Sequence, residues 1–587
     1  MCTILFLATT FRYGWVRRTS DFPNYYTAAV LVRQGQPLHK YYDWTWFEYQ
    51  MNYAGFEQVG AYLPQSPLAM LPLIGIAGLQ AQTAKRIWLA VNFAFLVATF
   101  WLSSRVTRFR IDQIAILAFL GFGTLHFNFL YGQYYVFILF LLTLAFYFLQ
   151  KSKPGYSGLL FGAAFALKLY GGPFLLYLGA KRHWRALTAL IAASLCLSLT
   201  AIAIFGWKDI AYFGTQILPR SVEGETLDPY SSLNGTLSTL LRRAFVMEPE
   251  LNPYPLWNAP RLFFFLRPFL TLAILTVPLL ALWRSTNQKR GFAWFFIAVM
   301  LASPNTGSYT FILLLLPVLL LLDEAKLPRQ IFLLTAIYIL LSIPPGPTWS
   351  FLFPKVWLLL ALFLYAGRDY WRLVRMKTAT AATAAITLIA ALSAIRHAAS
   401  FSKEPGQRWE RIAVQRGALF SSSPTVLHSG IVYQAIGKSR YVLRQFHEGR
   451  FEEFAFSGEA VHPVAQSPNG PIRFELLEHR SSTMMLFDPV RKTLTRERLA
   501  GSIDTPSLAV SPDGNWVAFT LATGGNQQVW LRHSGSTAMR ITGGNCNSSS
   551  PVWELDSKAV IFESDCGRGI GWTALYRAQL DQIARSN

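Results

Sequence analysis

The chain has 587 residues, of which 52% are hydrophobic and 14% are charged, whereas soluble proteins average about 25% charged residues. Its formal net charge is +22. The apolar residues form blocks close to the length of about 20 residues that crosses a bilayer as a helix. This composition excludes an ordinary soluble protein and predicts a polytopic α-helical membrane protein.

Residues 1–398 are predicted to form the transmembrane domain, with about eleven or twelve membrane-spanning helices. Residues 1–15 are interpreted as a transmembrane helix rather than a signal peptide, because no small-residue cleavage site follows them. Residues 67–79 are short for a span, and residues 156–180 are interrupted by Gly171-Gly172-Pro173, so interfacial or re-entrant elements are expected there. The clearest spans are residues 88–102, 114–130, 136–149, 187–205, 262–283, 331–343, 356–365 and 379–395.

Lysine and arginine residues gather in the short connections between these blocks, at 105–110, 151–153, 181–185, 284–290, 326–329 and 368–377. Short basic loops stay on the cytoplasmic side of a membrane, next to anionic lipids. The pattern predicts a multi-pass protein of the inner (plasma) membrane, with residues 17–64, 206–260 and the chain after 397 outside the cytoplasm. No soluble segment carries a basic patch with interleaved aromatic residues, so nucleic-acid binding is not expected.

The end of the chain has a different composition. Residues 399–419 are predicted to be a linker, and residues 420–587 are polar and strand-rich, with Ser-Pro-Asp-Gly turns and a repeat of about 40 residues. The repeats resemble the WD40-like repeats of TolB-type β-propellers, and the length leaves room for about four blades. An exported domain permits a disulfide between Cys546 and Cys566, although the sequence leaves this pairing open. The fold analogy suggests a glycan or protein partner for this domain.

Asp21 lies directly after the first apolar segment, beside Arg17 and Arg18 and ahead of Tyr25. A carboxylate in this place can act as a general base, and two guanidinium groups beside it can hold a phosphate. A simpler interpretation is that Ser20 or Asp21 caps a helix that begins near residue 23. The residue pattern alone favours capping.

Five stretches of the helical part resemble glycosyltransferase family 87. They read DFPNYYTAAVLVRQGQPLHKYY, YLPQSPLAMLPLIGIAGL, IWLAVNF, YGQYYVFILFLLTLAFYF and GLLFGAAFALKLYGGPFLLYL, and the resemblance covers roughly residues 10–370 in order. It implies a GT-C-type fold and a polyprenyl-phosphate sugar, with mannose as the expected hexose, as the donor. It implies Asp21 as the catalytic base, and neither a cofactor nor a metal is expected.

The resemblance and the chemistry of the leaving phosphate together give a set of candidate site residues. Lys168 is alone in an apolar run, where a lysine is functional by default unless it extends to the interface. Gln133, Tyr230 and Asn234 have turn chemistry as their alternative interpretation. The predicted phosphate-binding residues are Arg17, Arg18, Lys168 and Arg220, and the predicted sugar- or acceptor-binding residues are Tyr25, Gln133, Tyr230 and Asn234.

The sequence departs from the family pattern in three places. Tyr-Pro-Pro is replaced by Tyr62-Leu63-Pro64, and Lys-Tyr-Pro by Lys168 and Tyr170 with a displaced proline. The Trp and His expected after Ser303-Pro304 are replaced by residues 305–309, which read NTGSY. This change removes an imidazole and leaves the sugar open.

The sequence therefore predicts a membrane hexosyltransferase that moves a sugar from a polyprenyl phosphate to an extracytoplasmic glycolipid or cell-envelope glycan. The alternative is a non-enzymatic scaffold or lipid-sugar transporter that displays a binding propeller. A transporter is expected to show inverted repeats, which the hydropathy pattern lacks.

Overall fold

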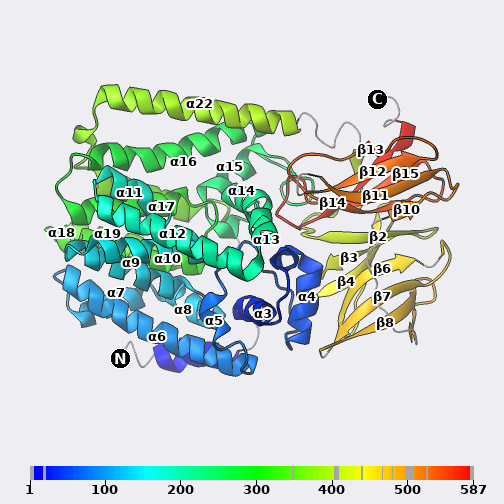
Figure 1. Cartoon of the computed structure of the whole chain (residues 1–587), viewed down its shortest axis with the longest axis horizontal. Helices are drawn as coiled ribbons and strands as arrows, with labels where there is room; N and C mark the ends of the chain where they lie inside the picture. Colours follow the sequence, from blue (N-terminus) through cyan, green and yellow to red (C-terminus); the bar gives the residue numbers. More distant parts are fainter. Residues whose placement is uncertain are drawn as a thin grey trace.

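The computed structural model describes residues 6–17, 21–226, 228–344, 346, 350–401, 409–437, 440–465, 467–478, 480–497, 508–523 and 526–581. It has two parts, a helical domain and a β domain that lie side by side (Figure 1). Helix α22 runs along one edge of the helical domain toward the β domain, and the C-terminus lies on the β side.

Within the described residues, four helices are long and apolar enough to cross a membrane. They are α6 (Ala81–Val106), α12 (Trp184–Phe205), α16 (Pro260–Leu282) and α22 (Met376–Phe401). Helices α7 (Ile111–Leu120) and α8 (Phe122–Tyr131) meet at a bend of 82° and add a fifth span if they are counted together. Three shorter apolar helices are α9 (Tyr135–Gln150), α19 (Pro328–Ser342) and α21 (Pro354–Gly367).

The sequence suggested more spans because many apolar blocks are short helices. In α17 (Gln288–Ala302), every residue from Phe292 to Leu301 is buried. A helix that is hydrophobic on all sides is buried in protein or lipid, and hydropathy does not distinguish the two. The other helices are α2 (Arg12–Val16), α3 (Phe22–Arg33), α4 (Trp44–Tyr53), α5 (Leu71–Ile74), α10 (Pro154–Lys168), α11 (Phe174–Ala180), α13 (Trp207–Tyr212), α14 (Leu218–Val222), α15 (Leu237–Phe245) and α18 (Leu315–Glu324).

The interruption expected in residues 156–180 is present. Helix α10 ends at Lys168, and α11 begins at Phe174. A side chain at Gly171 would place its Cβ 1.9 Å from the carbonyl oxygen of Phe161, so the turn can return against α10 only with glycine there. The break leaves Lys168 at a helix end instead of in the middle of a span.

The β domain consists of four four-stranded antiparallel sheets, which are the blades of a four-bladed propeller and confirm the predicted fold. The blades are β2-β3-β4-β5, β6-β7-β8-β9, β10-β11-β12-β13 and β14-β15-β16-β1. The strands are β1 (Trp409–Arg411), β2 (Ser421–Leu427), β3 (Gly430–Ile436), β4 (Tyr441–His447), β5 (Arg450–Phe454), β6 (Glu459–Ala465), β7 (Ile472–Glu478), β8 (Ser481–Asp488), β9 (Thr493–Arg496), β10 (Leu508–Val510), β11 (Trp516–Thr523), β12 (Asn526–His533), β13 (Met539–Arg540), β14 (Ser548–Trp553), β15 (Ala559–Ser564) and β16 (Ala574–Gln579).

The last blade is completed by the first strand of the domain. Strand β1 pairs with β16, with Trp409 opposite Ala578. The strand lies in residues 399–419, which the sequence suggested as a linker. Because the blade needs β1, the propeller begins upstream of residue 420, and the pairing ties the start of the domain to its end.

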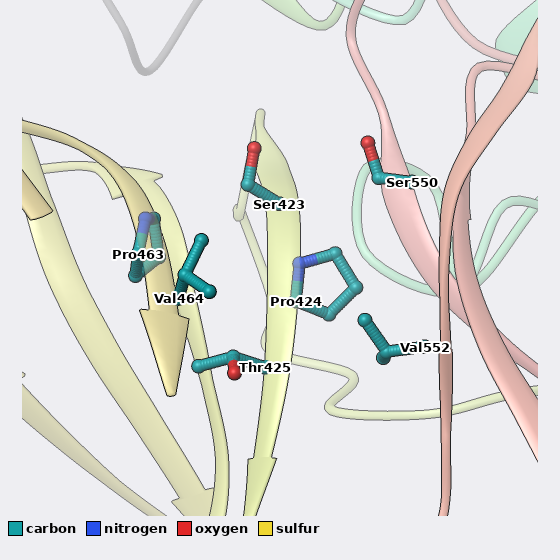
Figure 2. Close-up of a pocket in the computed structure, with 7 residues that line it drawn as sticks. All are labelled: Ser423, Pro424, Thr425, Pro463, Val464, Ser550 and Val552. Atoms are coloured by element: carbon teal, nitrogen blue, oxygen red, sulfur yellow. The ribbon is translucent and has the colours of Figure 1, made fainter. Parts of the chain in front are cut away.

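Three of the strands nearest the propeller axis line a small pocket (Figure 2). Its walls come from β2, β6 and β14, and they carry apolar side chains with three hydroxyl groups. No carboxylate, histidine or lysine is among the residues that line it: Ser423, Pro424, Thr425, Pro463, Val464, Ser550 and Val552. This pocket therefore offers no group for acid–base chemistry.

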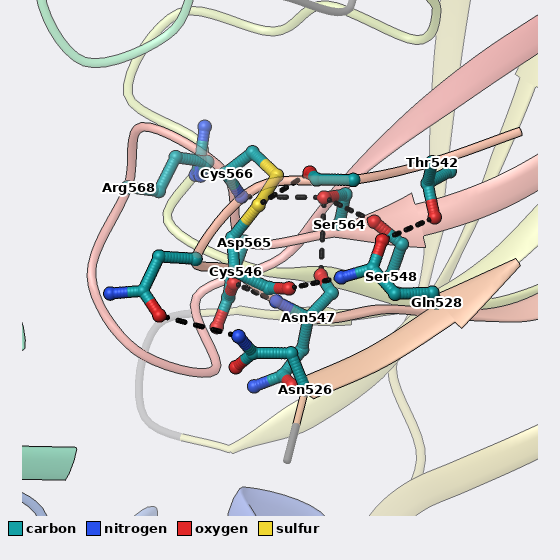
Figure 3. Close-up of a disulfide and its surroundings, with 12 residues drawn as sticks. Asn526, Gln528, Thr542, Cys546, Asn547, Ser548, Ser564, Asp565, Cys566 and Arg568 are labelled. Carbon is teal, nitrogen blue, oxygen red and sulfur yellow. Dashed lines mark hydrogen bonds between the residues drawn. A yellow bond between two sulfur atoms is a disulfide. The ribbon is translucent and has the colours of Figure 1, made fainter. Parts of the chain in front are cut away.

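Cys546 and Cys566 form a disulfide, which settles the pairing that the sequence left open (Figure 3). Their Cα atoms are 5.1 Å apart. Next to the bond, the Asp565 carboxylate accepts a hydrogen bond of 2.8 Å from the backbone N–H of Asn547. The disulfide holds the start of the segment from residue 566 to 572, and this segment contacts the helical domain.

The propeller is docked on α4 through aromatic side chains, and α4 lies between the two domains in Figure 1. The Trp44 indole N–H donates to the carbonyl of Ile570 at 3.0 Å. The Tyr49 hydroxyl donates to the Glu475 carboxylate at 2.7 Å. Trp44 also packs edge-on against Trp572. The two domains are therefore joined by specific contacts as well as by the chain.

Buried ion pairs reinforce this docking. Arg568 is fully buried and contacts Glu248 at 2.8 Å and Glu250 at 2.6 Å. Arg220 contacts Asp565 of the propeller at 2.9 Å and Glu225 at 3.0 Å. Buried charges are costly unless they are paired and hydrogen-bonded. These pairs thus require that the two domains stay together.

Two carboxyl groups, Glu48 of α4 and Glu459 of β6, also meet at the interface. Burial raises the pKa of Glu48 well above its usual value, and contact with Glu459 raises it further. Burial also raises the pKa of Glu459, against the influence of Glu48 and Arg440. The Glu48 carboxylate accepts the backbone N–H of Gly60 at 3.0 Å. The pair is therefore stable when one carboxyl keeps its proton.

We expect this pair to make the interface weaken as the pH rises. Because the folded-state pKa exceeds the unfolded one, the unfolding free energy should fall by about 1.4 kcal/mol per pH unit from the ordinary glutamate range up to the raised pKa. Denaturant unfolding of wild type and Glu48→Gln across this range checks this prediction, and the variant should lose the part of the slope that the Glu48 proton contributes. Glu452→Gln, in an exposed pair with Lys492, should keep it. A flat wild-type profile would contradict the prediction.

Candidate functional site

Asp21 precedes the first residue of α3, but its carboxylate does not cap this helix. One of its oxygens instead accepts a hydrogen bond from the Gln133 side-chain amide. Gln133 follows Gly132, whose positive φ of 66° ends α8. The Asp21 side chain is therefore not the cap of α3 and is directed to a neighbour 112 residues away in the chain, while Ser20, the other predicted cap, lies outside the described residues.

A continuous line of hydrogen bonds extends from Asp21 to Lys168. The Tyr25 hydroxyl donates to the Gln133 side-chain oxygen at 3.1 Å. The Lys168 ammonium donates to the Tyr25 hydroxyl at 2.8 Å and to the Gln65 side-chain oxygen at 2.5 Å. Four of the predicted site residues thus form one cluster, made by the start of α3, the turn after α8 and the end of α10.

Tyrosine rings surround the Lys168 ammonium. It lies 4.9 Å from the ring centre of Tyr25, 5.9 Å from Tyr134 and 5.3 Å from Tyr135. Tyr135 stacks on Tyr309 with ring centres 5.3 Å apart. Aromatic ring faces attract an ammonium group through their negative electrostatic potential. The ammonium is thereby held ready for an anion at this end of the cluster.

The Asp21 carboxyl is half-buried, and burial raises its pKa above the usual aspartate range. The Gln133 hydrogen bond and the charges of Lys168 and Lys85 act in the opposite direction. Lys85 also donates to the carbonyl of Arg17 at 2.7 Å. A raised pKa makes a carboxylate a stronger proton acceptor, which suits a general base.

The remaining predicted residues are not in this cluster. Arg17 is exposed at the end of α2, and Arg18 lies outside the described residues. The Arg220 guanidinium is occupied by Glu225 and Asp565, so its charge is already compensated and the predicted phosphate role does not fit. Tyr230 donates to the carbonyl of Gly567 at 3.1 Å. It therefore contributes to domain docking.

Asn234 lies in the turn that joins η4 (Ser232–Asn234) to α15. Its side-chain amide donates to the carbonyl of Asp228 at 2.9 Å, which is the turn chemistry that the sequence offered as the alternative. Its own carbonyl accepts the hydroxyl of Thr306 at 2.6 Å. Asn234 thus connects two outer loops.

The sequence alone did not single out Gln65, Lys85 or Tyr309. Gln65 lies in the YLPQSP stretch between two prolines, and a polar residue at the end of an apolar run was the available signal. Lys85 lies near the start of α6. Among the described residues, no three His, Cys, Asp or Glu side chains lie together in a way that holds a metal ion.

Comparison with protein families identifies the helical part. Residues 61–304 match the family model of glycosyltransferase family 87. The chain carries a glycosyltransferase family 87 domain. The matched range contains Gln65, Gln133 and Lys168.

The family 87 domain is joined to a propeller that has solved structural neighbours. TolB from Acinetobacter baumannii is 20% identical, with 26% of this chain and 39% of that chain covered and a TM-score of 0.15. A putative TolB from Agrobacterium tumefaciens is 16% identical, with 29% and 61% covered and a TM-score of 0.15. This chain thus spans less than two thirds of either structure. A search of curated proteins found no match.

Proposed function

We propose that this family 87 protein transfers a hexose, with mannose as the expected sugar, from a polyprenyl phosphate to an extracytoplasmic glycolipid or cell-envelope glycan. The observation that carries the proposal is the hydrogen-bonded line from Asp21 through Gln133 and Tyr25 to Lys168. It places a carboxylate and a cation at opposite ends of one polar cluster. A displacement that takes up a proton at one end and releases a phosphate at the other needs this arrangement.

In the proposed reaction, Asp21 accepts the proton of an acceptor hydroxyl. The hydroxyl oxygen forms a bond to the anomeric carbon while the bond from that carbon to the phosphate oxygen breaks. The electron pair leaves with the polyprenyl phosphate, whose charge Lys168 and Arg17 stabilise. Preorganised positive charge where negative charge develops lowers the barrier. Gln133 fixes the orientation of Asp21, and Tyr25 fixes that of Lys168.

The proposed location is the inner membrane, with the reaction and the propeller on the periplasmic side. Two observations support it. The basic connections lie at the helix ends away from Asp21 in the predicted topology, and the propeller has a disulfide, which oxidising compartments favour. The propeller is proposed to bind a glycan or protein partner near the site where the product is released.

The test is sugar transfer by the purified protein in detergent. We expect labelled polyprenyl-phosphate mannose to pass its label to a component of a membrane lipid extract, and a labelled nucleotide sugar to pass none. Transfer from another polyprenyl-phosphate hexose would correct the sugar and keep the chemistry. If the donors bind but no sugar is transferred to any extract, the proposed enzyme activity is wrong. The protein would then be a scaffold or a lipid-sugar transporter.

A further inference from the structure

A second lysine, Lys355, is buried at the end of α21 that faces the outer loops. Only 2% of its surface is exposed. Its ammonium donates to the Ser308 hydroxyl at 3.1 Å and lies 4.4 Å from the ring centre of Phe311. The opposite end of α21 leads into the basic connection at Arg368 and Arg372, which the topology predicts to be cytoplasmic. Lys355 is therefore on the same side of the membrane as Asp21.

The charge of Lys355 is not compensated within the described residues. An ammonium has three N–H donors, and within this part of the chain Ser308 is its single hydrogen-bond partner. No carboxylate in this part forms an ion pair with it, whereas Lys289, also near a helix end, contacts Asp323 at 2.7 Å. A buried cation without an anion is costly, and a bound anion at this place would compensate the charge.

Polar groups of two outer loops lie beside this cation. The turn at Ser232–Gly235 packs on the Lys355 stem, since a Cβ at Gly235 would be 3.4 Å from the lysine Cδ. The Ser232 hydroxyl contacts the Ser350 hydroxyl at 2.6 Å. Ser232 is half-exposed and Leu233 is 55% exposed. The Ser308 hydroxyl thus contacts the buried cation, and the partly exposed turn that carries Ser232 packs on the lysine stem.

The position of Lys355 relates it to the catalytic cluster. Ser308, its partner, is followed by Tyr309, which stacks on Tyr135 next to Lys168. Lys355 therefore contacts the short segment between α17 and α18 directly, and Lys168 is connected to the same segment through Tyr135. A site that handles two lipid-linked substrates requires a cation for each phosphate that it binds.

We propose that Lys355, with Ser308 and the turn at Ser232–Gly235, binds the phosphate group of a membrane-lipid substrate. The inference rests on the proposed function for the identity of the ligands. Two sources share this chemistry, the polyprenyl phosphate of the donor and the phosphate of a phosphoglycolipid acceptor. The positive end of α21, a helix of 14 residues, adds to the attraction for an anion.

The experiment measures ligand-induced stabilisation of the whole purified protein in a phosphate-free maltoside detergent. The ligands are polyprenyl phosphate, phosphatidylinositol and, as the phosphate-free probe, polyprenol. The variants are Lys355→Gln, Lys355→Arg and, as the matched control, Lys181→Gln, because Lys181 is a half-buried lysine that donates only to backbone carbonyls among the described residues. Unliganded Lys355→Gln should unfold at or above the wild-type temperature, since an uncompensated charge is removed.

We expect Lys355→Gln to weaken binding of at least one phosphate lipid by tenfold or more, Lys355→Arg to restore part of it, and Lys181→Gln to leave it unchanged. If Lys355→Gln weakens the binding of polyprenyl phosphate alone, the site binds the phosphate of the donor. If it weakens the binding of phosphatidylinositol alone, the site binds the phosphate of the acceptor. Wild-type affinity of Lys355→Gln for both lipids, or an equal loss of polyprenol binding, would overturn the proposal. Because binding is measured without transfer, failure of the proposed enzyme activity would be seen separately.

Discussion

Replacing Asp21 with Asn is expected to lower the rate of sugar transfer by about 100- to 10,000-fold, the range that a general base contributes. Asparagine has the same shape and can still accept the hydrogen bond of Gln133, so the fold and the donor affinity should be retained. The measurement is transfer from labelled polyprenyl-phosphate mannose at saturating donor, together with thermal unfolding of both proteins.

Asp43→Asn is the matched control for this variant. Asp43 belongs to the same outer loop, but its carboxylate caps α4 by accepting the backbone N–H of Trp46 at 2.9 Å. Asparagine is an equally good cap, so transfer should be unchanged. Equal transfer by wild type and Asp21→Asn would remove Asp21 from the mechanism while leaving the family assignment in place.

The acid side of the pH profile gives an independent check on Asp21. Since burial raises the pKa of its carboxyl, the base becomes protonated, and the rate falls, at a pH above the ordinary aspartate value of about 3.9. The residual activity of Asp21→Asn should lack this limb, because an amide does not titrate.

The resemblance to family 87 singled out residues of the cluster around Asp21 but not its full extent. Asp21, Gln133 and Lys168 each follow or end an apolar segment, where an isolated polar residue is visible in the sequence. Gln65 and Lys355 are equally close to apolar segments, but their significance comes from packing that brings distant segments together. The propeller was predictable because its turns and strands repeat in the sequence. The residues of its pocket and docking face do not recur at a fixed period, so the sequence did not predict them.

Arg220 shows where inference from charge alone fails. An arginine in an outer loop of a lipid-phosphate enzyme is a reasonable phosphate ligand, yet its partner Asp565 is 345 residues away in sequence. No local pattern predicts such a pair. The sequence predicted eleven or twelve spans, more than the long apolar helices among the described residues, for a related reason: hydropathy treats a helix buried in protein, such as α17, like one that faces lipid.

The largest effect on stability is expected for Arg568→Met. Arg568 is fully buried, and its removal leaves Glu248 and Glu250 buried with Arg411 as their remaining cation. Removing one partner of a buried pair costs about 3–5 kcal/mol. Because Arg411 still contacts both carboxylates, we expect a loss near the lower limit, about 3 kcal/mol. Denaturant unfolding and limited proteolysis of the whole chain measure it.

Arg577→Met provides the comparison, since Arg577 pairs with Glu410 and Glu554 on the propeller while 34% of its side chain stays exposed. Exposed pairs contribute about 0–1 kcal/mol, so this variant should unfold like wild type. If docking holds the outer loops in place, Arg568→Met should also reduce transfer, because Arg568 and Arg220 fix opposite ends of the loop from α14 to Glu250. Unchanged stability in Arg568→Met would mean that the helical domain and the propeller are joined mainly by α4. Unchanged sugar transfer would mean that catalysis does not depend on the docking contacts of Arg568.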